Sequence, residues 1–506
     1  MSKGKVYLVG AGPGDPGLLT LKAAECLSGA DVVIYDQLVD QHVLDFAPPQ
    51  AEFIYAGKSG AKHALEQDQI NALLVQKARR SNIVVRLKGG DPLVLGRGGE
   101  EADTLRKARI PFEIVPGVTS AVAVPAYAGI PVTHRGVASS FAVITGHEDP
   151  SKQQSSLNWD KLATGIDTLV FLMGMNNLKY ITSQLIKHGR KPGTPVAVIR
   201  DGTLPSQTTV TGTLDDIAAK VKKQGLGPPA VIVVGDVVKL RDRLRWYDQQ
   251  PLFGRRVLIT RPALQAEGME LMLRERGAVP VLHPVIDIKP AISYRKLDKA
   301  IKNIIHYDWL IFTSVNGVDA FFYRMDQLGK DARWLANIKT GVIGPATNRA
   351  LEERGIRSDF MPVVFTSTGL LAAIRRNRIK NKKVLLPRAN IADKELSDGL
   401  KELGASVDKV TVYRTVAARA SQSKRRELLL AGRIDVVTFT SASTVTGLLR
   451  GMNKEDIASI KAKIACIGPK TAQTAVSAGL KADIIAAEST TESLVEAMEQ
   501  YYREET

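Results

Sequence analysis

The residues with the clearest chemistry are glycines and two aspartates near the start of the chain. Val6-Tyr-Leu-Val-Gly-Ala-Gly-Pro-Gly-Asp15 predicts a buried strand and a glycine-rich turn, and Asp36 ends a second apolar run. An acid about 20 residues after such a turn is typical of dinucleotide-binding folds. Here, however, Asp15 occupies the third glycine position and would repel a pyrophosphate, and Pro13 and Pro16 stiffen the turn. The loop therefore favours a nucleotide-like ligand without phosphates, and S-adenosylmethionine is the obvious candidate.

These residues need a scaffold of strands and helices, and the pattern from Gly4 to Leu240 predicts one. Short apolar runs bounded by Gly and Pro alternate with amphipathic stretches, which is typical of a layered α/β fold. We expect strands at residues 6–9, 32–35, 83–87, 141–145, 168–173, 195–199 and 230–234.

The chain of 506 residues is too long for one ordinary core, so at least two domains are expected. Residues 241–254 are polar, contain a proline and have no strand pattern, and a fresh apolar run begins at Arg256. We place a linker at 246–253, between a first module at 1–245 and a second at 254–506.

The second module contains an internal repeat. Val257-Leu-Ile-Thr-Arg-Pro-Ala263 matches Val384-Leu-Leu-Pro-Arg-Ala-Asn390, and 311–316 matches 438–443, each at an offset of 127 residues. Ile-Gly-Pro recurs at 343 and 467. Three blocks in the same order predict two similar α/β lobes, at about 254–287 plus 415–506 and at 288–414. Ligands of such proteins bind where strands end and helices begin.

Charge and composition narrow the partners. The net charge is +17, and residues 251–506 carry 40 Lys and Arg against 28 Asp and Glu. Such an excess predicts an anionic partner, either nucleic acid or a multiply charged small molecule, although the basic run at 375–383 is also typical of a solvated helix end. Charge alone does not choose between these partners.

The cysteines and the hydropathy pattern favour a cytoplasmic protein. Cys26 and Cys466 fall in different modules, one in a predicted helix and one in a predicted buried strand, so we expect neither a disulfide nor a metal site. No apolar run reaches the ~18 residues of a membrane span, and no charged-then-apolar leader precedes Val6.

Residues 1–245 closely resemble the uroporphyrinogen-III C-methyltransferases, which use S-adenosylmethionine. The resemblance follows the whole module in order and is carried by motifs at 9–16, 35–36, 57–58, 85–92, 96–101, 116–121, 129–135, 145–147, 173–174 and 201–203. It implies that one set of residues binds the cofactor: Pro13, Gly89, Gly90, Asp91, Val94, Thr119, Ser120, Met173, Gly202 and Ala230.

The same resemblance implies roles for charged residues. Asp36 and Lys58 match the proton acceptor and donor of the family, although a strand-end aspartate is also a common turn residue and a lysine facing a polyanion can serve binding alone. Arg97, His134 and Arg135 match positions that could pair with substrate carboxylates, for which arginine is well suited. Ordinary loop cations remain the alternative for these three.

Residues 254–506 resemble the uroporphyrinogen-III synthases, through motifs at 260–262, 312–314, 386–388, 412–414, 439–441 and 467–469. The resemblance implies that Tyr413, expected at the end of a strand, donates a proton to a departing hydroxyl; packing is the alternative. Thr347, Ser441, Lys463 and Thr471 match polar positions lining the cleft and would bind carboxylates, with a lone sheet-edge lysine as the alternative at Lys463. No residue here resembles a nucleophile–base pair.

Together the resemblances imply a fused bifunctional enzyme with no metal requirement. It would cyclise hydroxymethylbilane to uroporphyrinogen III with inversion of ring D, and methylate C2 and C7 to give precorrin-2. A substrate with eight carboxylates would account for the positive charge without nucleic acid or membrane. The family also implies a homodimer through the first module. The rivals are a methylase of a later corrin precursor, a ribosomal-RNA methyltransferase and a basic nucleic-acid adaptor.

Overall fold

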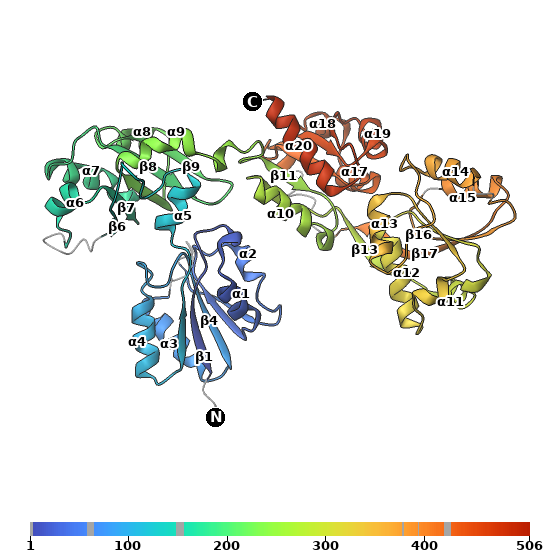
Figure 1. Cartoon of the computed structure of the whole chain (residues 1–506), viewed down its shortest axis with the longest axis horizontal. Coiled ribbons are helices and arrows are strands. Elements are labelled where there is room, and N and C mark those ends of the chain that lie inside the picture. The colour runs from blue at the N-terminus through green and yellow to red at the C-terminus, as the bar shows by residue number, and fades with distance from the viewer. Residues whose placement is uncertain are drawn as a thin grey trace. The chain divides into compact units, whose positions relative to one another are not determined.

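The computed structural model describes residues 4–57, 65–147, 156–376, 379–392, 394–418 and 427–505. The chain divides into two compact units, Met1–Gly254 and Arg255–Thr506, and each unit contains two five-stranded sheets (Figure 1). The two-part α/β fold expected from the sequence is confirmed.

The first sheet is wholly parallel and has the strand order β3-β2-β4-β1-β5. Apolar clusters cover both of its faces, as a parallel sheet requires. Its strands are β1 Lys5–Gly10, β2 Val32–Tyr35, β3 Glu52–Tyr55, β4 Ile83–Lys88 and β5 Phe112–Val115, and its helices are α1 Leu21–Ser28, α2 Gln41–Leu44, α3 Gln67–Ala78, α4 Gly98–Lys107 and α5 Ser120–Tyr127.

The second sheet is mixed, with the order β6-β7-β10-β8-β9, in which only β6 and β7 run parallel. Its strands are β6 Phe141–Thr145, β7 Thr168–Leu172, β8 Pro195–Arg200, β9 Thr208–Thr213 and β10 Ala230–Val234, and its helices are α6 Trp159–Gly165, α7 Leu178–Lys187, α8 Ile217–Lys223 and α9 Arg241–Leu244.

All seven strands expected in the first unit are present, and three unexpected ones join them: β3, β5 and β9. Each of the three is an edge strand, at one end of its sheet. An edge strand is half-exposed, so Glu52-Phe-Ile-Tyr and Thr208-Thr-Val-Thr lack the apolar run that marks a central strand.

Residues 246–253, where the sequence suggested a linker, are packed on the first unit. Tyr247 and Leu252 are buried, and the rings of Trp246 and Tyr247 contact the ring of Tyr127. This aromatic cluster extends the first compact unit to Gly254.

The second unit begins with lobe one, a parallel sheet in the order β12-β11-β18-β19-β20. Its strands are β11 Arg256–Ile259, β12 Val279–Leu282, β18 Val436–Phe439, β19 Lys463–Cys466 and β20 Ala482–Ile485, and its helices are η5 Ala263–Gln265, α10 Glu267–Glu275, α17 Ala442–Leu449, α18 Lys454–Ala458, α19 Pro469–Ser477 and α20 Thr491–Glu505.

Lobe two lies between these parts in sequence and has the order β13-β17-β16-β14-β15. Its strands are β13 Ile286–Pro290, β14 Trp309–Phe312, β15 Lys339–Val342, β16 Lys383–Ala389 and β17 Ser406–Ala417, and its helices are α11 Arg295–Lys302, α12 Val315–Gln327, α13 Pro345–Glu352, α14 Ser367–Arg376 and α15 Glu395–Glu402.

The repeat seen in the sequence recurs in the strand pairing. Val257 of β11 pairs with Val436 of β18, and Val384 of β16 pairs with Trp309 of β14. The residues of each pair differ from their counterparts by the same offset of 127 found in the sequence. The first block of one repeat therefore pairs with the second block of the other, so each lobe contains pieces of both repeats.

Candidate functional site

One edge of the first sheet gathers most of the predicted cofactor residues. Because β1, β2, β4 and β5 are parallel, their carboxyl ends meet at the same edge. The loops that leave this edge carry Pro13, Asp36, Gly89 to Val94, and Thr119 with Ser120. Thr119 caps α5, accepting a hydrogen bond from the Ala121 N–H.

A second edge brings together Met173, Gly202 and Ala230. Ala230 begins β10 and pairs with Arg200 at the end of β8, while Met173 follows β7. Met173 is not strand core, because it lies beyond the last residue of β7, is 53% exposed and has a φ of 58°. An exposed apolar side chain on a left-handed backbone is a costly arrangement that is typical of functional sites.

The two edges are joined by side-chain contacts around Asp15. The Asp15 N–H donates to the Thr203 hydroxyl at 3.1 Å, and the Tyr127 hydroxyl donates to Asp15 Oδ2 at 2.6 Å. A Cβ at Gly202 would lie 2.3 Å from a methyl group of Val124 on α5. The predicted cofactor residues of both sheets therefore belong to one neighbourhood.

Close backbone approach shapes this neighbourhood and fits an uncharged, adenosine-like ligand. Gly90 exchanges backbone hydrogen bonds with Gly12 and has a φ of 69°. A Cβ at Gly117 would lie 2.3 Å from the Gly90 carbonyl oxygen. The Asp91 carboxylate accepts from the N–H groups of Leu93, Val94 and Gly117, so its first role is to fix the loop.

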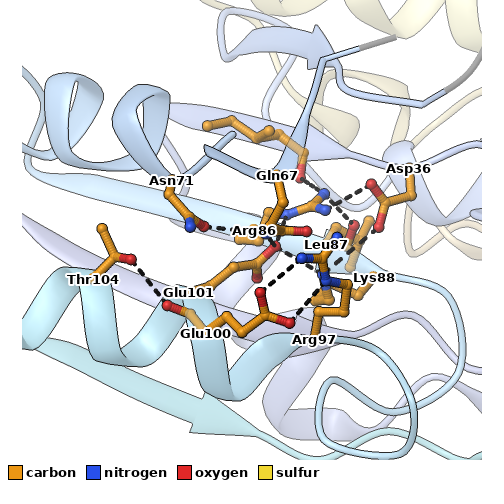
Figure 2. Close-up of polar contacts among 11 residues, drawn as sticks. Asp36, Gln67, Asn71, Arg86, Leu87, Lys88, Arg97, Glu100, Glu101 and Thr104 are labelled. Atoms are coloured by element: carbon orange, nitrogen blue, oxygen red, sulfur yellow. Dashed lines mark hydrogen bonds and ion pairs between the residues drawn. The ribbon is translucent and has the colours of Figure 1, made fainter. Parts of the chain in front are cut away.

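Behind Asp36 lies a buried network of four charged side chains (Figure 2). Arg86 Nη2 donates to Asp36 Oδ1 at 2.7 Å, and Arg86 Nε donates to Glu101 Oε1 at 3.0 Å. Lys88 Nζ donates to Glu101 Oε1 at 2.8 Å and lies 3.9 Å from Asp36 Oδ2. The side chain of Asp36 is 29% exposed, whereas that of Glu101 is fully buried. Asp36 is thus the solvent-facing end of this network.

Burial dominates the energetics of this network. Desolvation is the main reason that the pKa of Lys88 is lowered, and the positive charge of Arg86 adds to the effect. Glu101 Oε2 is buried and has no hydrogen-bond partner among the described residues. Opposite charges compensate one another, so removing any one member would leave an uncompensated buried charge.

Sequence reasoning gave no role to Arg86, Lys88 and Glu101. A signal was available, because Ile83-Val-Val-Arg-Leu-Lys places two cations inside the apolar run of a central strand. Buried cations need buried anionic partners, so this run predicts an acid such as Glu101 nearby.

The remaining charged predictions in the first unit are less closely placed. Lys58 lies outside the described residues. Arg97 is exposed, precedes α4 with a φ of 57°, and donates to both carboxylate oxygens of Glu100 (Figure 2). His134 forms a short backbone bridge with Ala138, and Arg135 next to it is exposed.

In the second unit, Tyr413 lies within β17 rather than at its end. It is the residue at which β17 exchanges its parallel partner β16 for the antiparallel partner β13. The side chain is buried, with its hydroxyl 3.2 Å from Ser314 Oγ. Burial raises the pKa of Tyr413, and hydrogen bonds from Ser314 and Asn316 act in the opposite direction.

Three of the four predicted cleft residues follow the carboxyl ends of strands. Thr347 and Thr471 are buried in the first turns of α13 and α19, and Ser441 caps α17. Two interactions connect such positions across the lobes, one between Gln265 and Asn316 and one between Lys470 and Glu395. The carboxyl-end edges of the two lobes therefore face each other.

Lys463 lies apart from these residues. It is the first residue of β19, at the amino end of the strand, and its Nζ lies 3.6 Å from Glu505 and over the ring of Tyr501. The two ends of a parallel strand are on opposite edges of the sheet, so the structure does not bring Lys463 together with Ser441 and Thr471. The alternative interpretation, a sheet-edge lysine, fits its position.

Arg261 is a cation at the carboxyl edge that the sequence reasoning quoted only within a motif. It follows β11, and its Nη1 donates to the Thr491 hydroxyl at 2.9 Å. Its buried Nε has no partner among the described residues, and burial lowers the pKa of the guanidinium. A buried donor of this kind suits a carboxylate ligand.

Comparisons with known proteins agree with this geometry. The family described as Tetrapyrrole (Corrin/Porphyrin) Methylases matches residues 5–218, and Uroporphyrinogen-III synthase HemD matches residues 267–496. A uroporphyrinogen-III C-methyltransferase of Bacillus subtilis is 43% identical and covers 70% of this chain and 72% of its own. The solved uroporphyrin III C-methyl transferase of Thermus thermophilus is 42% identical, covers 47% of this chain and all of its own, and has a TM-score of 0.41.

The porphyrin biosynthesis protein HemD of Ruminiclostridium josui is 40% identical over 98% of both chains. None of the helices in the described part of the chain is long and apolar enough to cross a membrane. This chain therefore belongs to the HemD family of porphyrin biosynthesis proteins, and it joins a tetrapyrrole methylase to a uroporphyrinogen-III synthase.

Proposed function

We propose that this chain catalyses two consecutive steps of tetrapyrrole biosynthesis. Residues 254–506 close hydroxymethylbilane to uroporphyrinogen III with inversion of ring D, and residues 1–245 methylate that product at C2 and C7 to give precorrin-2. The observation that carries the proposal is the presence of both families in one chain, each with its candidate residues gathered at the carboxyl edges of its sheets.

In the methylase unit, S-adenosylmethionine supplies the methyl groups. The loops around Pro13, Gly90, Met173 and Gly202 hold it, with no phosphate to accommodate. Each methylation releases one proton from the macrocycle, and the Asp36 carboxylate is the group placed to accept it. Arg86, held in turn by Glu101, fixes Asp36 in position. Arg97, His134 and Arg135 bind substrate carboxylates, and Lys58 is the proton donor.

In the synthase unit, Tyr413 protonates the hydroxyl group that leaves the linear substrate. Arg261, Ser441, Thr347 and Thr471 surround this chemistry with donors for carboxylates. Because the described cleft offers no nucleophile–base pair, the reactivity of the pyrroles themselves drives ring closure. Lys463, at the opposite edge, is not included.

We further propose a homodimer through the methylase unit and a cytoplasmic location. The relatives named for uroporphyrinogen III favour this substrate over a later corrin precursor or ribosomal RNA. The net charge of +17 then serves a substrate with eight carboxylates rather than nucleic acid.

The test supplies the full chain with hydroxymethylbilane and S-adenosylmethionine and follows the mass and absorbance of the product. We expect the type III isomer carrying two added methyl groups. Type I isomer alone would refute the synthase activity, and type III isomer without methyl groups would refute the methylase activity.

A further inference from the structure

Tyr413 meets two side chains from the start of α12 in lobe two. Ser314 caps this helix and approaches the Tyr413 hydroxyl to 3.2 Å, and Asn316 in the first turn hydrogen-bonds the same hydroxyl. Most buried tyrosines need only one polar partner. Two partners on one phenol oxygen constrain the direction in which its proton points.

The direction of the Asn316 amide is set by the other lobe. Gln265, at the end of η5 in lobe one, donates from its Nε2 to Asn316 Oδ1. An amide whose oxygen is taken has only its NH₂ group left, so Asn316 donates to the Tyr413 oxygen. The chain of hydrogen bonds therefore runs from Gln265 through Asn316 to Tyr413, across the boundary between the lobes.

A phenol oxygen that accepts from Asn316 directs its own proton elsewhere, toward a second acceptor. It is also prepared to carry negative charge after the proton has left, because a donor already faces it. Both effects favour a tyrosine that gives a proton away over one that only packs.

We infer that Asn316 is a positioning residue for the Tyr413 phenol, and that Gln265 fixes its orientation only when the two lobes are in contact. The inference rests on the proposed role of Tyr413. As the substrate C–O bond breaks, its electron pair stays on oxygen and the Tyr413 proton joins that oxygen to form water. The adjacent pyrrole supplies electrons to the carbon, and the phenolate accepts from Asn316.

A double-mutant cycle in the full chain tests this inference through the rate at which hydroxymethylbilane closes to the type III isomer. Tyr413→Phe is expected to lower kcat by about 10²-fold. Asn316→Ala should lower kcat by about tenfold, the scale of one hydrogen bond to a developing charge, and leave KM nearly unchanged. Because Asn316 acts through the phenol, the double variant should be no slower than Tyr413→Phe alone.

Additive losses in the double variant would overturn the inference while leaving the role of Tyr413 intact. An unchanged rate in Tyr413→Phe would overturn both. Asn316→Asp adds a sign test, because a carboxylate would accept the phenol proton instead of donating, so kcat should fall further than in Asn316→Ala. Gln265→Ala should have a smaller loss than Asn316→Ala.

Controls come from the same chain. Asn303, an exposed amide at the end of α11, donates only to the Lys299 carbonyl, so Asn303→Ala should leave ring closure unchanged. The methylation rate of each variant reports whether the protein is folded, since the methylase is a separate compact unit.

Discussion

The two units orient their proton-handling groups by opposite means. In the methylase, Asp36 is held by a network of full charges in which Glu101 is completely buried. In the synthase, Tyr413 is held by neutral partners, a hydroxyl from Ser314 and an amide from Asn316. A base that must remain an anion benefits from a cation beside it, whereas an acid that must keep its proton until the reaction is better served by neutral groups.

The difference also sets how each site responds to substitution. Removing one partner of a buried charge network costs roughly 3–5 kcal/mol, because the remaining charge stays buried without compensation. Removing a neutral partner costs about 1 kcal/mol. The methylase site should therefore be hard to alter without loss of stability, and the synthase site should tolerate changes that affect only its rate.

The largest expected effect is on Asp36. Asp36→Asn keeps the shape of the side chain and a hydrogen-bond acceptor for Arg86 but removes the base, so methylation should slow by about 10²–10⁴-fold. Affinity for S-adenosylmethionine, measured by calorimetry, should change little. Unchanged methylation at saturating substrate would reduce Asp36 to a binding residue.

Tyr413→Phe should have a smaller effect, of about 10²-fold on ring closure, since it removes a neutral acid rather than a charge. The unclosed substrate would then cyclise without ring inversion, and the fraction of type I isomer in the product should rise. Chromatography of the two isomers measures this fraction. A threefold loss with type III still dominant would mean that Tyr413 serves packing.

A stability comparison follows from the two networks. Glu101→Gln should destabilise the methylase unit by about 3 kcal/mol, because Arg86 and Lys88 lose their buried anion. Ser314→Ala should destabilise the synthase unit by about 1 kcal/mol. Calorimetric unfolding of the full chain measures both, and equal losses would contradict the contrast drawn between the units.

The smallest effect concerns Cys466, which lies buried in β19. Burial raises the pKa of its thiol to about 11, from about 8.5 in an unfolded chain. The folded state thus favours the thiol, and this contribution to stability is complete below pH ~8.5 and disappears as the pH rises toward 11. The urea midpoint should fall over this range, and it should fall less in Cys466→Ala. Identical pH profiles would exclude this contribution.

Central elements were predictable from sequence and peripheral ones were not. The runs at 32–35, 141–145 and 230–234 became strands with the expected bounds, because strands buried on both faces need continuous apolar residues. The edge strands β3, β5 and β9 lack such runs. The linker expected at 246–253 was misjudged for a related reason, since its aromatic rings bury against Tyr127 without forming any periodic pattern.

The candidate sites divide in a similar way. Residues on loops after strands, such as Pro13 and Gly90, were placed by the parallel topology itself. Lys463 was misplaced because sequence shows that a residue borders a strand but not which edge of the sheet it occupies. Asn316 and Gln265 escaped notice because their pairing joins segments 51 residues apart that only the packed lobes bring together.

The exchanged pairing of the repeats has a consequence for synthesis on the ribosome. The strands β11 and β12 emerge early, but the remaining partner of β11 is β18, and β19 and β20 follow near the end of the chain. Lobe two, at 286–417, is complete long before those strands exist. The apolar strand Arg256-Val-Leu-Ile259 must therefore wait with one edge unpaired while roughly a third of the protein is made, and this interval is when the chain is most exposed to aggregation and chaperones.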